Sequence, residues 1–218
     1  MKNKIILIFS LFFLYSCQAK LNSTKNKLQN LPPKNINFEN KEKAYFASGC
    51  FWCVEAIFES LKGVEEVFSG YAGGTTTNPT YNSIGTGRTG HAESVEVIYD
   101  KSKISFETLV DVFFGSHDPT TLNRQGPDIG SQYRSIAFYK NEEEKEIINR
   151  KIDSLTNKNI FKKSIKTEIK KLEKFYYAED YHQDYEKLNP NNPYVINVSI
   201  PRLNNFKSKF SNLLKKNH

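Results

Sequence analysis

The chain has 218 residues, of which 38% are hydrophobic and 25% charged, a composition that predicts one folded domain with appendages and excludes disorder throughout. With 11 glycines, 8 prolines and 3 cysteines, it is neither collagen-like, nor a disulfide-stapled scaffold, nor a four-cysteine zinc protein. The formal net charge is +7, but the lysines are spread among many acidic residues and form no basic stripe, so nucleic-acid binding is not expected.

Residues 1–16 have the pattern of an export signal peptide. Two lysines precede an apolar run from Ile5 to Tyr15, which is shorter than the roughly 20 apolar residues that a membrane-spanning helix needs. The segment Leu14-Tyr15-Ser16-Cys17 resembles a bacterial lipobox, in which cleavage before the cysteine leaves its sulfur to be lipidated. We therefore predict lipidation of Cys17, against two alternatives: a plain secreted protein and a poorly cleaved anchor.

Residues 17–41 are predicted to contain the lipidated cysteine and a flexible tether. They are rich in Asn, Lys and Gln, include Pro32-Pro33 and show no sustained helical or strand period. Residues 42–218 would then form the folded domain. We expect an exported lipoprotein of the cell envelope, anchored to the membrane on its periplasmic or other extracytoplasmic side.

The first half of the domain alternates between strand and helix patterns. Ser105 is expected to cap a helix, and long irregular stretches are expected at 70–90 and 115–132. Strands are predicted at 43–48, 64–71, 94–99 and 133–139, with helices between Gly49 and Gly63 and after Ser105.

The second half continues the alternation. A helix is predicted at 142–155, a strand around 165–169, a short aromatic helix at 178–188 and an amphipathic helix after Arg202. Both element types within one domain favour an α/β (α+β) two-layer sandwich, with a mixed sheet, flanking helices and a ferredoxin-like core with extensions.

Cys50 and Cys53 form a C-x-x-C pair at the predicted junction between the first strand and the first helix. The first turn of a helix favours thiolate, so we expect a lowered pKa for Cys50 and assign it as the nucleophile. Residues three apart in a helix have Cα atoms roughly 5 Å apart, so Cys53 can resolve an oxidised Cys50 by forming a disulfide. Half of a zinc site, for which no second pair exists, and a static disulfide are the alternatives; no metal is expected.

The phrase Gly49-Cys50-Phe51-Trp52-Cys53-Val54-Glu55 resembles the active-site signature of peptide methionine sulfoxide reductase A. Further segments, in family order between about 43 and 210, look like family motifs. They are Asn78-Pro79-Thr80-Tyr81, Thr89-Gly90-His91-Ala92-Glu93, His117-Asp118-Pro119-Thr120-Thr121, Asn123-Arg124-Gln125-Gly126, the run from Asp128 to Ser135, and Ala178-Glu179-Asp180-Tyr181-His182-Gln183. The resemblance implies reduction of the S epimer of methionine sulfoxide, free or in proteins, and so the repair of oxidised proteins.

The resemblance also implies roles for individual residues. The departing sulfoxide oxygen needs a proton, and the family's acid matches Glu93, whose burial would keep it protonated near neutral pH. Tyr81 and Tyr133 match the phenols that donate to the sulfoxide oxygen, and Asp128 a supporting polar residue. Phe51 and Trp52 match the aromatic pocket for the substrate methyl group.

No bound cofactor is expected, and electrons would come from a thioredoxin-type or other thiol reductant. Because no cysteine follows Cys53, regeneration must use Cys53 or an external thiol directly. We expect a monomer that acts on oxidised proteins or peptides. Two alternatives stay open: a general thiol-disulfide oxidoreductase, and a non-catalytic lipoprotein that binds Met-rich partners through Phe51 and Trp52.

Overall fold

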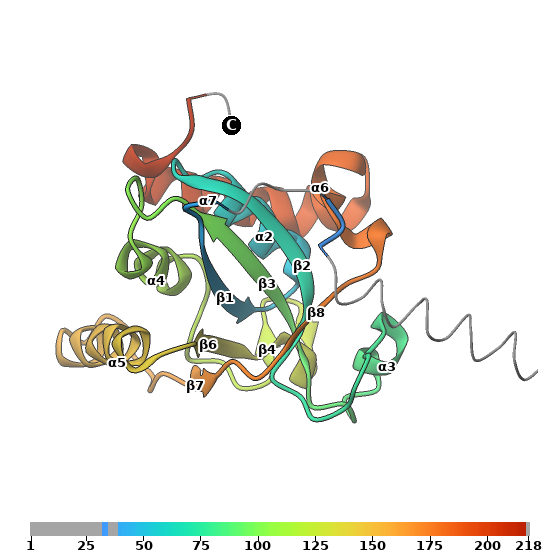
Figure 1. Ribbon diagram of the computed structural model, residues 1–218, viewed down its shortest axis with the longest axis horizontal. Coiled ribbons are helices and arrows are strands. Elements are labelled where there is room, and N and C mark those ends of the chain that lie inside the picture. The colour runs from blue at the N-terminus through green and yellow to red at the C-terminus, as the bar shows by residue number, and fades with distance from the viewer. Residues whose placement is uncertain (1–31, 35–38, 217–218) are drawn as a thin grey trace, which may run out of the picture.

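The computed structural model describes residues 32–34 and 39–216, and a six-stranded mixed sheet forms the centre of the molecule (Figure 1). The predicted export signal, Cys17 and most of the predicted tether lie outside the described residues. The spatial order is β7-β6-β1-β3-β2-β8; β6 and β7 pair in parallel, and the other neighbours pair antiparallel. The bounds are Glu42–Ser48 (β1), Val64–Ala72 (β2), Ala92–Tyr99 (β3), Ser135–Tyr139 (β6), Glu168–Lys171 (β7) and Phe175–Tyr177 (β8).

The four central strands have the ferredoxin-like arrangement. Helix α2 (Phe51–Glu59) connects β1 to β2, and helix α4 (Phe106–Gly115) connects β3 to β6. The two strands of each unit run parallel, because both pair antiparallel with the single strand between them. Strands β7 and β8 extend the two edges, and helix α5 (Glu142–Asn157) follows β6. The expected sandwich with a ferredoxin-like core and extensions is confirmed.

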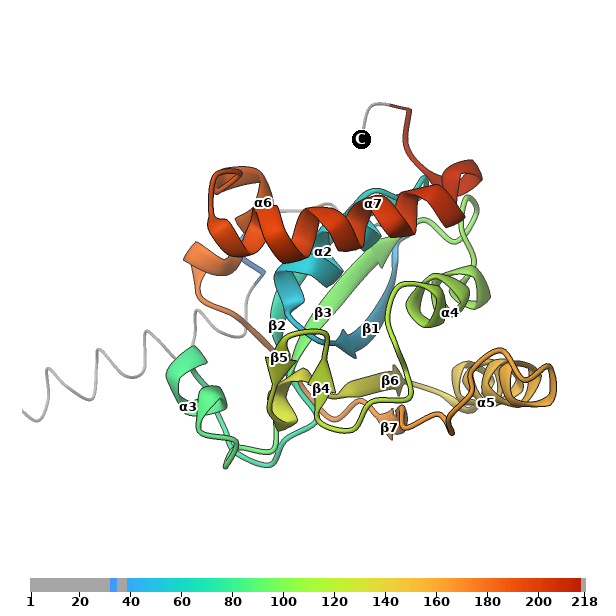
Figure 2. The same ribbon diagram turned by 180° about the vertical axis from the view of Figure 1, so that it is seen from behind.

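The main core lies between the sheet and the helices on one of its faces. Phe46 of β1 stacks on Phe58 of α2 and on Phe113 of α4, with ring centroids 5.1 Å away in each case. The apolar residues that predicted α2 and α4 are therefore the residues that dock these helices on the sheet. Helix α7 (Ile200–Lys209) packs on α2, as Figure 2 shows.

The predicted start and end signals of several helices are confirmed. The hydroxyl of Ser105 accepts from the backbone N–H of Thr108, and the side chain of Asn141 caps α5 in the same way. Gly63 has a φ of +87°, a left-handed conformation that suits glycine and turns the chain from α2 into β2.

The two stretches expected to be irregular contain short elements. Helix α3 (Tyr81–Gly85) lies in the first and begins with a capping box, in which the side chains of Thr80 and Ser83 bond each other's backbone N–H groups. The second contains a small hairpin of β4 (Arg124–Gln125) and β5 (Asp128–Ile129), followed by a 3₁₀ turn at Ser131–Tyr133. Elements this short have no measurable period, which is why hydrophobic patterning did not predict them.

The predicted aromatic helix at 178–188 is wrong. This stretch follows β8 and contains a 3₁₀ turn at Asp180–His182 and the four-residue helix α6 (Tyr185–Leu188). Asp184 between them has a φ of +52°, which interrupts any continuous right-handed helix. The terminal helix is preceded by a π-helical turn at Val195–Ser199, in which each turn is one residue wider than in an α-helix.

None of the helices within residues 32–34 and 39–216 combines the length and apolar character that crossing a bilayer requires.

Candidate active site

Cys50 and Cys53 lie where the chain passes from β1 into α2. Gly49 makes the tight turn with a φ of +93°, Cys50 is the N-cap residue of α2, and Cys53 lies in the first turn. Both thiols are free and buried, with 6% and 2% of their surface exposed. They are hydrogen-bonded to each other, which supports their ability to join in a disulfide.

The expected lowering of the pKa of Cys50 is wrong for this structure. Burial, together with the neighbouring Cys53 and Glu93, raises the pKa of Cys50 well above its ordinary value. The hydrogen bond from Cys50 lowers the pKa of Cys53 to about 6, despite burial. The helix N-terminus does not set the pKa of Cys50, because the free-energy cost of desolvating a buried thiolate exceeds the stabilisation that the helix N-terminus provides.

Three groups from the C-terminal segment surround Cys53. Its sulfur lies 3.1 Å from the hydroxyl of Ser199, and Tyr194 and Arg202 also favour its thiolate form. Arg202 in turn donates to the carbonyl oxygen of Ser48 at 3.0 Å, which ties α7 to the end of β1. We did not predict these groups, because nearly 150 residues separate them from Cys53 and no motif marked them. The π-helical turn before α7 was the missing element, since it carries Ser199.

Glu93 is on the face of β3 that points toward α2, together with Val95 and Val97. Its Oε2 accepts a hydrogen bond of 3.1 Å from the backbone N–H of Phe51. Glu93 is only 2% exposed, and this burial raises its pKa to about 8. The carboxyl group is therefore mostly protonated near neutral pH, as we expected for the acid.

The two tyrosines implied as donors lie near Glu93 and Cys50. Burial, Glu93 and Cys50 raise the pKa of Tyr81 to about 12, and the pKa of Tyr133 is also raised. Both phenols thus keep their O–H groups at physiological pH. Asp128 accepts a 2.6 Å hydrogen bond from the hydroxyl of Tyr194, so it is joined to the C-terminal segment as well.

Phe51 and Trp52 belong to a continuous aromatic cluster. The Phe51 ring lies 6.2 Å from Trp52 and 6.4 Å from Tyr81, measured between centroids. The Trp52 ring stacks on Tyr185 at 3.7 Å, and its Nε1–H donates to Nδ1 of His182 at 3.2 Å. Such rings can pack against a thioether sulfur or methyl group. Tyr185 and His182 were not among the predicted binding residues, and α6 brings them there.

The three histidines of the resembling motifs make structural hydrogen bonds, the role expected of them. Nδ1 of His91 accepts from the backbone N–H of Gly74, and His117 bonds the carbonyl of Phe113 and the hydroxyl of Ser135. His182 accepts from Trp52, as described above.

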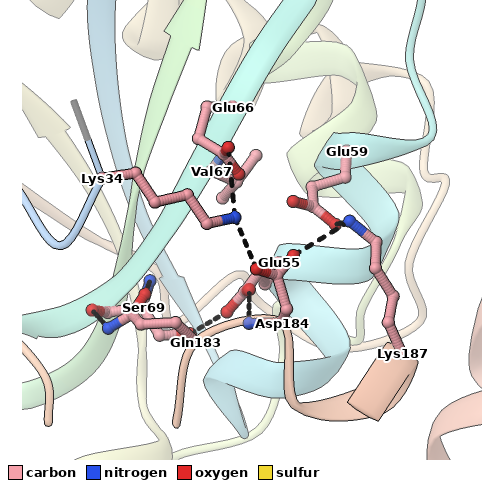
Figure 3. A network of polar contacts seen from close by, with 9 residues as sticks. All are labelled: Lys34, Glu55, Glu59, Glu66, Val67, Ser69, Gln183, Asp184 and Lys187. Carbon is pink, nitrogen blue, oxygen red and sulfur yellow. Dashed lines mark hydrogen bonds and ion pairs between the residues drawn. The ribbon is translucent and has the colours of Figure 1, made fainter. Parts of the chain in front are cut away.

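A polar network on α2 holds the helix against β2 and α6 (Figure 3). Glu55 accepts from the hydroxyl of Ser69 and from the backbone N–H of Asp184. Lys187 bridges Glu59 and Asp184 at 2.6 and 3.0 Å. The oxygens of these three acids converge within 4.8 Å, but lysines and hydrogen-bond donors already engage them. The network therefore positions the helix that carries both cysteines.

Adjacent thiols at the start of a helix perform redox chemistry, and a protonated acid beside them suits a reaction in which an oxygen atom must leave. These features define the protein as a thiol-dependent oxidoreductase. The chain belongs to the peptide methionine sulfoxide reductase A family: the family model described as peptide methionine sulfoxide reductase matches residues 42–214. Members of this family reduce methionine sulfoxide with electrons from thiols, and this chain is an enzyme of that kind.

Relatives and solved structures agree with this assignment. The chain is 49% identical to the MsrA of Pasteurella multocida over 174 residues, covering 80% of this chain and 99% of that protein. It is also 49% identical to the MsrA of Nautilia profundicola over 164 residues, which cover 75% of this chain and 93% of that protein. Methionine sulfoxide reductase A of Corynebacterium diphtheriae superposes with a TM-score of 0.63 at 38% identity, covering 70% and 77%. Reduced Mxr1 from Saccharomyces cerevisiae superposes with a TM-score of 0.67 at 31% sequence identity, and the match covers 72% of this chain and 91% of Mxr1.

Proposed function

We propose that Cys50 is the nucleophile, Glu93 the general acid and Cys53 the resolving thiol in the reduction of methionine S-sulfoxide by an exported, membrane-anchored protein. The observation that carries the catalytic part is the position of Glu93. A buried carboxyl group with a pKa of about 8 is bonded to the residue that follows Cys50. A protonated acid at this point can serve the sulfur chemistry of Cys50 directly.

In the first step, the Cys50 sulfur attacks the sulfoxide sulfur. The oxygen cannot leave as a dianion, so Glu93 supplies a proton to it, while the hydroxyls of Tyr81 and Tyr133 donate hydrogen bonds. Methionine is released, and the oxygen passes to Cys50 as a sulfenic acid. The sulfoxide sulfur gains two electrons, and the Cys50 sulfur supplies them.

In the second step, Cys53 attacks the Cys50 sulfenic acid. A sulfur–sulfur bond forms, the sulfur–oxygen bond breaks, and the oxygen leaves as water. The low pKa of Cys53, about 6, favours the thiolate that this attack requires. A thioredoxin-type protein or another thiol then reduces the Cys50–Cys53 disulfide, which restores the enzyme.

Substrate selection is assigned to the aromatic cluster. Phe51 is fully buried and Trp52 half-buried, so together they form a rigid wall for the substrate methyl group beside Cys50. Asp128 supports this side of the site through its bond with Tyr194. Oxidised proteins and peptides are the proposed substrates, and a monomer suffices because one chain supplies every group.

The cellular location rests on the sequence before Glu42. A signal-like segment at 1–16, the lipobox-like cysteine at 17 and a polar tether fit a lipoprotein of the cell envelope. Lys34, inside the predicted tether, pairs with Glu66 and Asp184 of the folded domain, so in this proposal only the residues before Lys34 can serve as the spacer.

A turnover assay with separate S and R sulfoxides of an N-blocked methionine tests this function. We expect turnover of the S epimer and none of the R epimer. Reduction of insulin disulfides without sulfoxide turnover would instead identify a general thiol-disulfide oxidoreductase. Binding of Met-rich peptides with no oxidation of Cys50 would identify a non-catalytic binding protein.

A further inference from the structure

A second buried carboxyl group lies near the two cysteines, and the mechanism above does not use it. Glu186 belongs to the short helix α6, which packs on α2 (Figure 2). Its Oε1 atom is buried and has no hydrogen-bond partner among the residues that the structure describes. A buried carboxylate oxygen without a partner is energetically costly, so this group requires a proton of its own or a donor close by.

Two groups that can exchange a proton with Glu186 lie beside it. The sulfur of Cys53 and the hydroxyl of Ser199 are 3.1 Å apart, and the carboxyl group of Glu186 faces both. Ser199 is fully buried, and Cys53 is only 2% exposed. A hydroxyl both donates and accepts hydrogen bonds, so Ser199 can connect the sulfur with the carboxyl group in a place that bulk water does not reach.

The charges at this place favour one proton shared by two acids. Arg202 of α7 is the cation that acts on both Cys53 and Glu186. One positive charge compensates one anion, whereas two adjacent anions in a buried site repel each other strongly. Cys53 and Glu186 therefore keep one proton between them near neutral pH.

This proton resides on the carboxyl group and not on the sulfur. Burial and the negative charge of Cys53 raise the pKa of Glu186 to about 8, whereas the pKa of Cys53 is about 6. A protonated carboxyl group donates a hydrogen bond to a neighbouring thiolate, and such charge-assisted bonds are strong. Ser199 and Tyr194 add further hydrogen bonds that favour the thiolate of Cys53.

We propose that Glu186 is the proton partner of the resolving thiol: it holds the proton of Cys53 in the reduced enzyme and releases it when the disulfide forms. The inference rests on the proposed role of Cys53 as the resolving thiol. The Cys53 thiolate attacks the sulfur of the Cys50 sulfenic acid. A sulfur–sulfur bond forms, the sulfur–oxygen bond breaks, and the oxygen leaves with the electron pair as hydroxide.

The proton of Glu186 balances this step. In the disulfide Cys53 carries no charge, so Arg202 then favours the carboxylate form of Glu186 alone. The proton that Glu186 loses converts the hydroxide into water. When a thioredoxin-type dithiol reduces the disulfide, it supplies two electrons and two protons. One proton goes to the Cys50 thiol and the other to Glu186, and Cys53 is again a thiolate.

Infrared difference spectroscopy can follow this proton, because a protonated carboxyl group has a C=O stretching band that a carboxylate lacks. The full-length protein carries Cys17→Ala, so that only Cys50 and Cys53 are oxidised, and diamide forms the disulfide without any sulfoxide. We expect the loss of a protonated-carboxyl band when the disulfide forms. A disulfide that forms without this loss would overturn the proposal. Failure to form the disulfide would count against the proposed function itself, and the inference would fall with it.

Two variants assign the band. Glu186→Gln should form the disulfide without the loss. Glu144→Gln is the matched control and should keep the loss, because Glu144 is also buried but belongs to α5, far from α6 in Figure 2, and accepts from the backbone N–H of Lys140. A loss of the same size in Glu186→Gln would assign the proton to another acid and overturn the proposal.

Single-turnover kinetics with methionine S-sulfoxide separate a role in the second step from a structural role. Glu186→Gln keeps the shape of the side chain but cannot hold the proton. We expect methionine release near the wild-type rate and disulfide formation slowed about tenfold or more, with both steps unchanged in Glu144→Gln. Equal slowing of both steps in Glu186→Gln would indicate a structural effect, and unchanged disulfide formation would show that its carboxyl group takes no part. Either result would overturn the proposal.

Discussion

The carboxyl group of Glu93 is joined to the first residue of helix α2, because its Oε2 accepts the backbone N–H of Phe51 at 3.1 Å. This bond links strand β3 to the chain position immediately after Cys50. It fixes the proposed acid close to the proposed nucleophile, although 42 positions in the sequence separate Phe51 from Glu93. The remaining oxygen of Glu93 is then the one that carries the acidic proton.

Replacing Cys50 with serine should abolish turnover, since a hydroxyl lacks the nucleophilicity of a thiolate and forms no disulfide with Cys53. The measurement is methionine released per enzyme in the presence of an excess of a thioredoxin-type reductant. Cys53→Ser is the matched control and should still release one methionine per enzyme. A near-normal rate in Cys50→Ser would reject Cys50 as the nucleophile.

Glu93→Gln preserves the shape of the side chain and removes its acidic proton. Single-turnover reduction should slow by about 10² to 10⁴, the usual contribution of a general acid. Glu96→Gln is a useful control, because Glu96 is equally buried in β3 but bonds Tyr45 and Tyr177 instead of the site. If Glu93→Gln reacts as fast as Glu96→Gln, another group must protonate the oxygen.

The pH dependence of the single turnover should be bell-shaped. Protonated Glu93 is lost as the pH rises through about 8, which produces the falling limb. Because the pKa of Cys50 is raised, its thiolate is scarce at neutral pH. The thiolate becomes more abundant as the pH rises, which produces the ascending limb. Glu93→Gln should keep the ascending limb and lose the falling one. A falling limb with the same midpoint in that variant would contradict the assignment.

Cys53→Ser should stop the cycle at the sulfenic acid. Mass spectrometry after one turnover is expected to show a Cys50–Cys53 disulfide in the wild type and a trappable Cys50 sulfenic acid in the variant. Cycling with a thioredoxin-type reductant should fail, and a small monothiol should restore it in part. Normal thioredoxin-supported cycling in Cys53→Ser would show that a single cysteine suffices.

Cys17→Ala should abolish lipid attachment. Expressed in a bacterium that processes lipoproteins, the wild type is expected to incorporate labelled fatty acid and to fractionate with membranes, because its sulfur is acylated after cleavage. Cys53→Ser retains Cys17 and should be labelled normally. Recovery of unlabelled mature wild-type protein from the soluble fraction would reject the lipobox assignment.

Much of this protein follows from local patterns in its sequence. The apolar spacing of Val54, Ile57 and Phe58 predicts helix α2, and Ser105 marks the start of α4, because these signals depend only on neighbouring residues. The alternation of strands and helices was enough for the fold class. The motifs around Cys50 and Glu93 also named the two groups that the structure brings together through Phe51.

Tertiary structure alone decided the electrostatics of the thiols. Local reasoning assigned a low pKa to Cys50 from its place at the helix start, but the burial of Cys50 under distant chain segments raises it. Ser199, Arg202 and Tyr194 reach Cys53 from a segment that no short-range signal connects to it. The stretch at 178–188 failed as a helix for a related reason: the backbone N–H of Ala178 donates to the carbonyl of Ser69 in β2, and Asp184 adopts a left-handed conformation. The periodicity of apolar residues depends only on neighbouring positions in the sequence. The desolvation of a side chain and the pairing of a strand depend on which distant segments pack around that residue.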